Sequence, residues 1–364
     1  MFVALRDLRF ARGRFVLISA VVALITVLVG FLSGLTGGLA IQNISAVLAL
    51  PGDRIVFSAP DGEDEPVTFA DSAISAEQEA AWSDTAGVTS VTPIGISQGR
   101  AERAGDAGGD VDTARAAVAF FGVEPGSRAH APDAPGTVSL SDPAADALGA
   151  TVGDTLTIAG SSYRVAKVGG DDWYSHTPVV QMALDDWREV AAATGHPDAY
   201  ATVLAVSGDP NWAVADAAHD TVSEAPLGSL TALSAFRSEI GSLLLMVAML
   251  FGISGLVIGA FFTVWTMQRQ GDVAILKALG ASNRSLVRDA LGQALIVLIG
   301  GIGIGLLLVT VLGSLAGTAL PFLLSPLTTL LPGAIMTVLG LLGAAFALRS
   351  VTSADPLTAL GSNR

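Results

Sequence analysis

"SEIGSLLLMVAMLFGISGLVIGAFFTVWTM", Ser238 to Met267, is the stretch that decides the fold of this chain. It is predominantly apolar, and no charged residue follows Glu239 within it. A helix needs about 20 predominantly apolar residues to cross a bilayer, and this stretch exceeds that length. Three further charge-free stretches lie at 15–41, 290–320 and 329–348. We therefore expect an α-helical integral membrane protein with four transmembrane helices, the second of them at 240–267.

The composition agrees with a membrane protein. Of the 364 residues, 51% are hydrophobic and only 14% are charged, whereas about 25% are charged in ordinary soluble domains. The stretch at 15–41 is longer than the apolar region of a secretory signal peptide, about 7–15 residues, and lacks a convincing small-residue cleavage site near its end. We therefore expect it to be retained as the first helix.

The basic residues predict the orientation in the membrane. Segments 1–14, 268–289 and 349–364 hold 10 of the 19 basic residues and only four of the 33 acidic residues. Cytoplasmic segments are enriched in Lys and Arg. These segments are therefore predicted to be a basic N-terminal segment, a pair of coupling helices and a C-terminal tail, all on the cytoplasmic side of the cell membrane.

The segment at 42–239 then faces outward, and it is strongly acidic, with 9 basic and 29 acidic residues. Such a charge disfavours nucleic acid as a partner and favours solubility. Its second half is readable: 134–171 predicts a strand, a helix capped by Asp142 or Ser141, and two strands joined at Gly160 and Ser161. More strands and a short helix follow, so we expect an α+β domain between the first two helices; the pattern at 50–130 assigns no fold.

Several kinds of chemistry are absent from the sequence. There is no phosphate-binding loop of the G-x-x-x-x-G-K-[ST] type and no nucleophile signature. The four histidines are scattered without metal-ligand spacing, and there is no cysteine. We therefore expect a chain that is not itself an enzyme and that has no intrinsic cofactor.

The cytoplasmic segment between the second and third spans carries a recognisable pattern. "MQRQGDVAILKALGASNRSLVRDALGQ", Met267 to Gln293, predicts two short amphipathic helices separated by a turn at 280–282. Such helices can lie in the membrane interface, extend a transmembrane helix, or dock into a groove of a partner protein.

Part of this segment resembles the cytoplasmic loop of the FtsX-like permease domain of ABC transporters. The match is carried by Asp272, Ile275, Leu276, Lys277, Ala278, Leu279, Gly280, Ala281 and Ser282. The glycine-rich third span and the closing "DPLTAL" at 355–360 also fit that domain. The resemblance implies a type VII, MacB-like permease that works as a homodimer with two copies of a separate ATPase subunit. That subunit would bind ATP and Mg, and its motion would reach the outer domain by mechanotransmission through the first two helices.

The same resemblance implies roles for the coupling residues. Ile275, Leu276 and Leu279 would enter a groove of the ATPase, with Lys277 and Arg284 as polar contacts at its rim and Gly280 in the turn.

The sequence also resembles the haem-exporting members of this family. The resemblance lies in the first 45 residues, in "SSYRVAKVGGDDWYSHTPVVQM" at 161–182 and in "SEIGSLLLMV" at 238–247. It implies haem as the transported substrate, extracted from the outer leaflet of the membrane.

Glu239 is the candidate substrate residue, because it lies at the outer end of the second span. A carboxylate oxygen is a plausible ligand for ferric iron, and in a twofold dimer Glu239 would meet its own copy across a bound haem cation. The residues predicted to line the haem site with it are Phe236, Leu243 and Met246, at helical spacing, and Asn43 from the end of the first span.

Plainer interpretations of these residues remain open at the sequence level. Glu239 could be an interfacial residue beside Arg237, the apolar residues could serve helix packing, and Asn43 could only end a helix. Tyr174 and His176 could contact haem from above, although a surface histidine with satisfied hydrogen bonds is more common. The alternative functions are a mechanotransmitting regulator of an extracytoplasmic partner and an exporter of another amphiphile, such as a peptide antibiotic.

Overall fold

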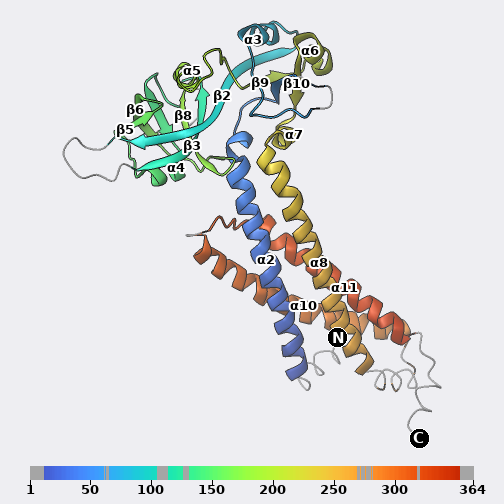
Figure 1. The fold of residues 1–364 in the computed structure, drawn as a ribbon. Helices are drawn as coiled ribbons and strands as arrows, with labels where there is room; N and C mark the ends of the chain where they lie inside the picture. Colours follow the sequence, from blue (N-terminus) through green and yellow to red (C-terminus); the bar gives the residue numbers. More distant parts are fainter. Residues whose placement is uncertain are drawn as a thin grey trace. The chain divides into compact units, whose positions relative to one another are not determined.

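The computed structural model describes residues 12–60, 62, 65–104, 114–125, 131–268, 271, 275, 280, 282–317 and 320–352. The chain divides into two compact units. The membrane unit comprises Met1–Leu39 and Gly241–Arg364, and the outer unit comprises Ala40–Ile240. The two units are described separately below, and Figure 1 gives the element labels.

Four long helices carry the apolar stretches of the sequence. They are α2 (Arg12–Leu48), α8 (Ser234–Gln268), α10 (Asn283–Ala316) and α11 (Pro326–Thr352). All four are long and apolar enough to cross a membrane. The sheet-rich outer unit lies in the chain between α2 and α8, so the predicted fold class is confirmed.

The helices differ in length from the predicted spans. Helix α2 continues beyond residue 41 to Leu48, and α8 begins at Ser234 instead of residue 240. Helix α10 ends at Ala316, before the predicted limit at 320. Gly317 is its C-terminal cap. Helices α2 and α8 are longer than the predicted spans because backbone hydrogen bonding extends a helix through polar residues, whereas hydropathy marks only its apolar part. The limits of the lipid-embedded part remain predictions.

Glycines allow the helices of the membrane unit to approach one another closely. A Cβ atom on Gly305 of α10 would lie 2.5 Å from Cβ of Thr26 and 2.8 Å from the carbonyl oxygen of Ala23, both on α2. A Cβ atom on Gly343 of α11 would lie 2.8 Å from Cα of Gly259 on α8. Small residues at such crossings are typical of membrane helices, because lipid supplies no hydrophobic driving force for their association.

The outer unit contains a ten-stranded sheet with helices packed on it. The strands are β1 Arg54–Ser58, β2 Val88–Arg103, β3 Arg115–Val123, β4 Thr137–Leu140, β5 Thr155–Ile158, β6 Ser161–Val168, β7 Trp173–Tyr174, β8 Thr177–Ala183, β9 Val203–Gly208 and β10 Thr221–Glu224. The helices are α3 Ala76–Ser83, α4 Asp142–Leu148, α5 Leu184–Ala193, α6 Trp212–His219, α7 Pro226–Ser229 and the 3-10 helix η1 Leu230–Ala232.

One half of the sheet closes into a small barrel. The strand order β2-β3-β8-β4-β6-β5 is completed by pairing between β5 and β2. Closure leaves no free strand edge around the ring. The barrel core consists of buried residues from these strands: Val118, Phe120, Leu140, Leu156, Ile158, Val165, Val180 and Met182.

The other half is the antiparallel sheet β10-β1-β9-β2. Strand β2 belongs to both halves and runs from one to the other (Figure 1). Because side chains alternate along a strand, Ile55 and Phe57 of β1 face one core while Val56 faces another. The first, the α2-side core, includes Ile44 and Val47 of α2; the second, the α3-side core, includes Trp82 of α3.

The predicted pattern at 134–171 is found with one correction. Strand β4 leads into α4, which is capped by the Ser141 side chain. The hairpin that follows turns at Ala159 and Gly160, not at Gly160 and Ser161, because Ser161 already belongs to β6. Both turn residues have positive φ, 49° and 88°, as a two-residue hairpin matched to the twist of its strands requires.

Candidate functional site

Three segments of the outer unit meet at the carboxylate of Glu239. They contribute Asn43 from α2, His176 from the turn between β7 and β8, and Glu239 from α8. Nε2 of His176 lies 2.9 Å from Oε2 of Glu239, and the Asn43 amide donates from Nδ2 to the same oxygen at 3.1 Å. Nδ2 of Asn43 lies 3.3 Å from Nε2 of His176. Since an Nε2 proton directed at the carboxylate leaves that nitrogen no acceptor lone pair, this third distance is a contact between two donors.

The turn that carries His176 is attached to α2 by its backbone. Ser175 and His176 both have left-handed backbone conformations, with φ of 48° and 64°. Their N–H groups donate to the carbonyl oxygens of Asn43 and Gln42, each at 3.0 Å. The N–H of Trp173 donates to Oγ of Ser45 at 2.8 Å. These bonds to residues 42, 43 and 45 of α2 fix the position of the turn that carries the imidazole.

Asn43 is fully buried, although its side chain is polar. Its amide must direct Nδ2 toward Glu239, because the opposite orientation would place Oδ1 against a carboxylate oxygen. Oδ1 is buried without a hydrogen-bond partner among the described residues. Asn43 therefore does more than end a helix, since α2 continues to Leu48.

Glu239 and His176 are accessible from outside the protein. Their side chains are 44% and 33% exposed. Carboxylate oxygen and imidazole nitrogen are both metal ligands, so an incoming metal centre could meet either group. Within the described part of the chain, no group of three or more His, Cys, Asp or Glu residues is arranged to hold a metal ion of its own.

The apolar residues predicted around Glu239 are found in different surroundings. Phe236 packs against the α2-side core of the outer unit. Leu243 and Met246 belong to the membrane unit, where Leu243 is half-buried and Met246 is exposed. That they line a haem site with Glu239 remains a prediction.

Tyr174 and His176 lie two residues apart in the sequence, but the structure separates their surroundings. The Tyr174 ring packs edge-on against Phe69 and Phe121, and its burial raises the pKa of its phenol. His176, considered above as a surface histidine with satisfied hydrogen bonds, has its Nε2 bonded to Glu239. The residue itself was visible in the sequence, but nothing local indicated this partner.

The structure describes some of the predicted coupling residues and not others. Ile275 is 62% exposed, and Gly280 has a positive φ of 94°; their predicted roles in docking remain predictions. Arg284 is exposed in the first turn of α10, after the capping residue Ser282. The predicted contacts Leu276, Lys277 and Leu279 lie outside the described residues.

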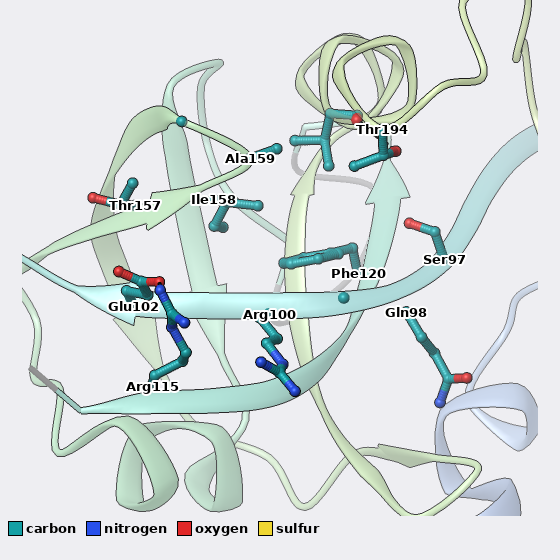
Figure 2. A pocket seen from close by; sticks show the side chains of 13 residues that line it. Ser97, Gln98, Arg100, Glu102, Arg115, Phe120, Thr157, Ile158, Ala159 and Thr194 are labelled. Carbon is teal, nitrogen blue, oxygen red and sulfur yellow. Dashed lines mark hydrogen bonds and ion pairs between the residues drawn. The ribbon is translucent and has the colours of Figure 1, made fainter.

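The outer unit also contains hollows away from Glu239. One has a volume of about 380 Å³ and is bordered by strands β2, β3 and β5 (Figure 2). Figure 2 shows Arg115 beside Glu102 there, and the two form an ion pair. A second, of about 610 Å³, is lined by aromatic residues such as Phe69 and Trp187 and by His196. Of the residues considered for the haem site, Tyr174 alone lines one of these two hollows, the second.

Comparisons with known proteins place the chain among transporter permeases. Residues 238–356 match the family of FtsX-like permease C-terminal domains. Over 372 residues, covering 100% of both chains, the sequence is 22% identical to a protein of Staphylococcus epidermidis named hemin transport system permease protein HrtB. It is 24% identical to the HrtB protein of Staphylococcus haemolyticus, over 99% of both chains.

An uncharacterized ABC transporter permease of Mycobacterium tuberculosis is also 24% identical, over 99% of both chains. Among solved structures, the periplasmic region of MacB from Actinobacillus actinomycetemcomitans aligns with a TM-score of 0.33 at 13% identity, covering 50% of this chain and 93% of that one. Together with four helices able to span a membrane, the sequence relatives confirm the predicted resemblance and the multi-pass location in the cell membrane. Residues 238–356 therefore form an FtsX-like permease C-terminal domain, and the chain is similar over its whole length to ABC transporter permeases, among them the HrtB proteins.

Proposed function

We propose that this permease extracts haem from the outer leaflet of the membrane and expels it, driven by a separate ATPase subunit. The observation that carries the proposal is the half-exposed carboxylate of Glu239, held by two hydrogen bonds at the outer end of an apolar helix. Haem is a flat apolar macrocycle with a ferric centre, so it partitions into lipid and takes anionic oxygen ligands. The whole-length similarity to proteins named hemin transport permeases supports this choice of substrate.

The proposed assembly is a homodimer of this chain with two ATPase subunits, which bind ATP and Mg. In a twofold dimer, the two copies of Glu239 would approach the same haem. Two carboxylates close together in a medium of low dielectric repel each other unless a cation lies between them, and ferric haem supplies that cation. ATP binding by the partner would move α2 and α8, the helices that lead into the outer unit, and so change the haem site.

The test is a Glu239→Ala variant of the full chain, reconstituted with its ATPase and titrated with hemin. We expect hemin affinity to fall by at least about tenfold, equivalent to about 1.4 kcal/mol, and hemin-stimulated ATP hydrolysis to disappear while the complex still assembles. The matched control is Glu77→Ala, which removes an exposed carboxylate of α3. Unchanged hemin binding by the Glu239 variant would contradict the proposal.

The same titration, together with the haem sensitivity of a strain that lacks the protein, separates the alternative functions. A mechanotransmitting regulator would show no hemin binding in the wild type, and a strain lacking it would not become sensitive to haem. An exporter of another amphiphile, such as a peptide antibiotic, would respond to that compound and not to hemin.

A further inference from the structure

The hydrogen bonds of Glu239 have a geometry that ligation of iron alone does not require. Both His176 and Asn43 reach the same oxygen, Oε2. Two donors on one oxygen, coming from different segments, restrict rotation of the carboxylate about its last side-chain bond. A carboxylate has about four acceptor positions on its two oxygens, so such bonds are compatible with ligation of a metal.

The two donors are themselves rigidly placed. His176 lies in a turn whose consecutive N–H groups are bonded to α2, at the carbonyl oxygens of Gln42 and Asn43. Its left-handed backbone conformation is uncommon for a residue other than glycine, which indicates a conformation imposed by its surroundings. Asn43 is fully buried in α2 and directs its Nδ2 at Glu239. The backbones that carry both donors are therefore fixed relative to α2.

We propose that His176 and Asn43 are positioning residues for Glu239, which fix the plane of its carboxylate for an incoming ferric haem without contacting the haem. The proposal rests on the proposed function, because it takes Glu239 as the group that meets the iron. Partners that hydrogen-bond a metal ligand orient it, and their loss typically lowers metal affinity by about 10- to 100-fold. A free Glu239 side chain would still offer a carboxylate, but in many orientations.

The proposal also explains why Oδ1 of Asn43 is buried without a hydrogen-bond partner among the described residues. A buried amide oxygen without a partner is unfavourable, and an apolar side chain of similar size would avoid that loss. Asparagine at this position is explained if its amide nitrogen is needed at Glu239. The buried oxygen is then a cost of supplying the donor.

The test is a titration of hemin into the purified full chain in lipid nanodiscs, followed by the Soret band. We expect His176→Ala and Asn43→Ala each to weaken hemin binding by about tenfold or more, with the wild-type Soret maximum at saturation. His176→Gln should recover most of the affinity, because its amide N–H can donate to the carboxylate. His196→Ala is the matched control, since His196 is an exposed histidine of a different hollow.

Three outcomes would overturn the proposal. A shifted Soret maximum in His176→Ala would make His176 an iron ligand. A further loss of affinity in His176→Ala/Glu239→Ala, beyond that of Glu239→Ala, would show action independent of Glu239. Wild-type affinity in both His176→Ala and Asn43→Ala, with binding lost in Glu239→Ala, would remove this inference and leave the proposed function standing.

The remaining outcome concerns the proposed function itself. Hemin binding retained in Glu239→Ala would remove both. Because Asn43 is buried, the thermal unfolding midpoint of each variant is measured first, and the half-exposed His176 carries the decision if Asn43→Ala does not fold.

Discussion

The membrane unit and the outer unit of this chain both contain buried apolar side chains, but they differ in what brings their elements together. In the membrane unit, glycines such as Gly305 and Gly343 bring helix backbones together. In the outer unit, buried aromatic and aliphatic side chains such as Trp82 and Phe121 fill the cores. The difference follows from the solvent: water drives apolar side chains together, whereas lipid does not, so helices in the membrane depend more on van der Waals packing and on hydrogen bonds between helices.

The exposed surfaces show the same contrast. In the membrane unit, large apolar side chains such as Leu245, Met249 and Leu256 of α8 are exposed. In the outer unit, exposed large apolar residues are few and scattered, for example Val152 and Val214. An exposed leucine is therefore common in the membrane unit and uncommon in the outer unit.

The largest expected effect tests whether the outer unit depends on a filled core. Trp82 is fully buried, packs near Trp212 and His219, and donates from Nε1 to Thr221 at 3.2 Å. Trp82→Ala should lower the free energy of unfolding of the outer unit by about 3–5 kcal/mol. Calorimetry of the full chain in detergent measures this. Val214→Ala, at a side chain 63% exposed, should change little, and an equal loss there would contradict the comparison.

A smaller effect tests whether the membrane unit depends on close approach. Gly305→Ala places a methyl group 2.5 Å from Cβ of Thr26, so α2 and α10 must separate, and we expect a loss of about 1–3 kcal/mol. The matched control is Gly303→Ala on the same helix, where nothing lies within 4 Å. That variant should be neutral or slightly stabilised, because alanine favours helix over glycine.

The measurement for this pair is the thermal midpoint of the helical circular dichroism signal in detergent. Equal midpoints for the two alanine variants would show that close approach does not stabilise the membrane unit.

The smallest effect compares two helix caps, one in each unit. In the outer unit, Oγ of Ser141 accepts from the N–H groups of Ala144 and Val179, at 3.3 and 3.2 Å, and is buried. Ser141→Ala should cost about 1–2 kcal/mol, because buried donors lose their acceptor. In the membrane unit, exposed Ser282 caps α10, and water can replace its oxygen, so Ser282→Ala should cost about 0.5 kcal/mol. Hydrogen exchange at the first turn of each helix measures both, and a larger loss at Ser282 would reverse the expected order.

Much of the outer unit was not predictable in advance. The sequence pattern of strand β2 did not predict its place in the fold. The strand crosses from the antiparallel sheet into the barrel, so its two faces are covered by different elements along its length. Local rules did work where local chemistry decides, as at the cap of α4, for which the sequence offered Asp142 or Ser141 and the structure has Ser141. They misplaced the β5–β6 turn by one residue, since the register of β5 against β6 decides which residues turn.

By itself, the sequence determined four apolar helices, their orientation and a carboxylate at the outer end of the second one, because hydropathy and charge act residue by residue along the chain. Only the tertiary structure decided that His176 and Asn43 meet this carboxylate. They are separated from Glu239 by 63 and 196 residues. Their meeting depends on a left-handed turn bonded to α2. No local pattern specifies such a contact, since it arises when backbone groups far apart in the chain satisfy one another's hydrogen bonds.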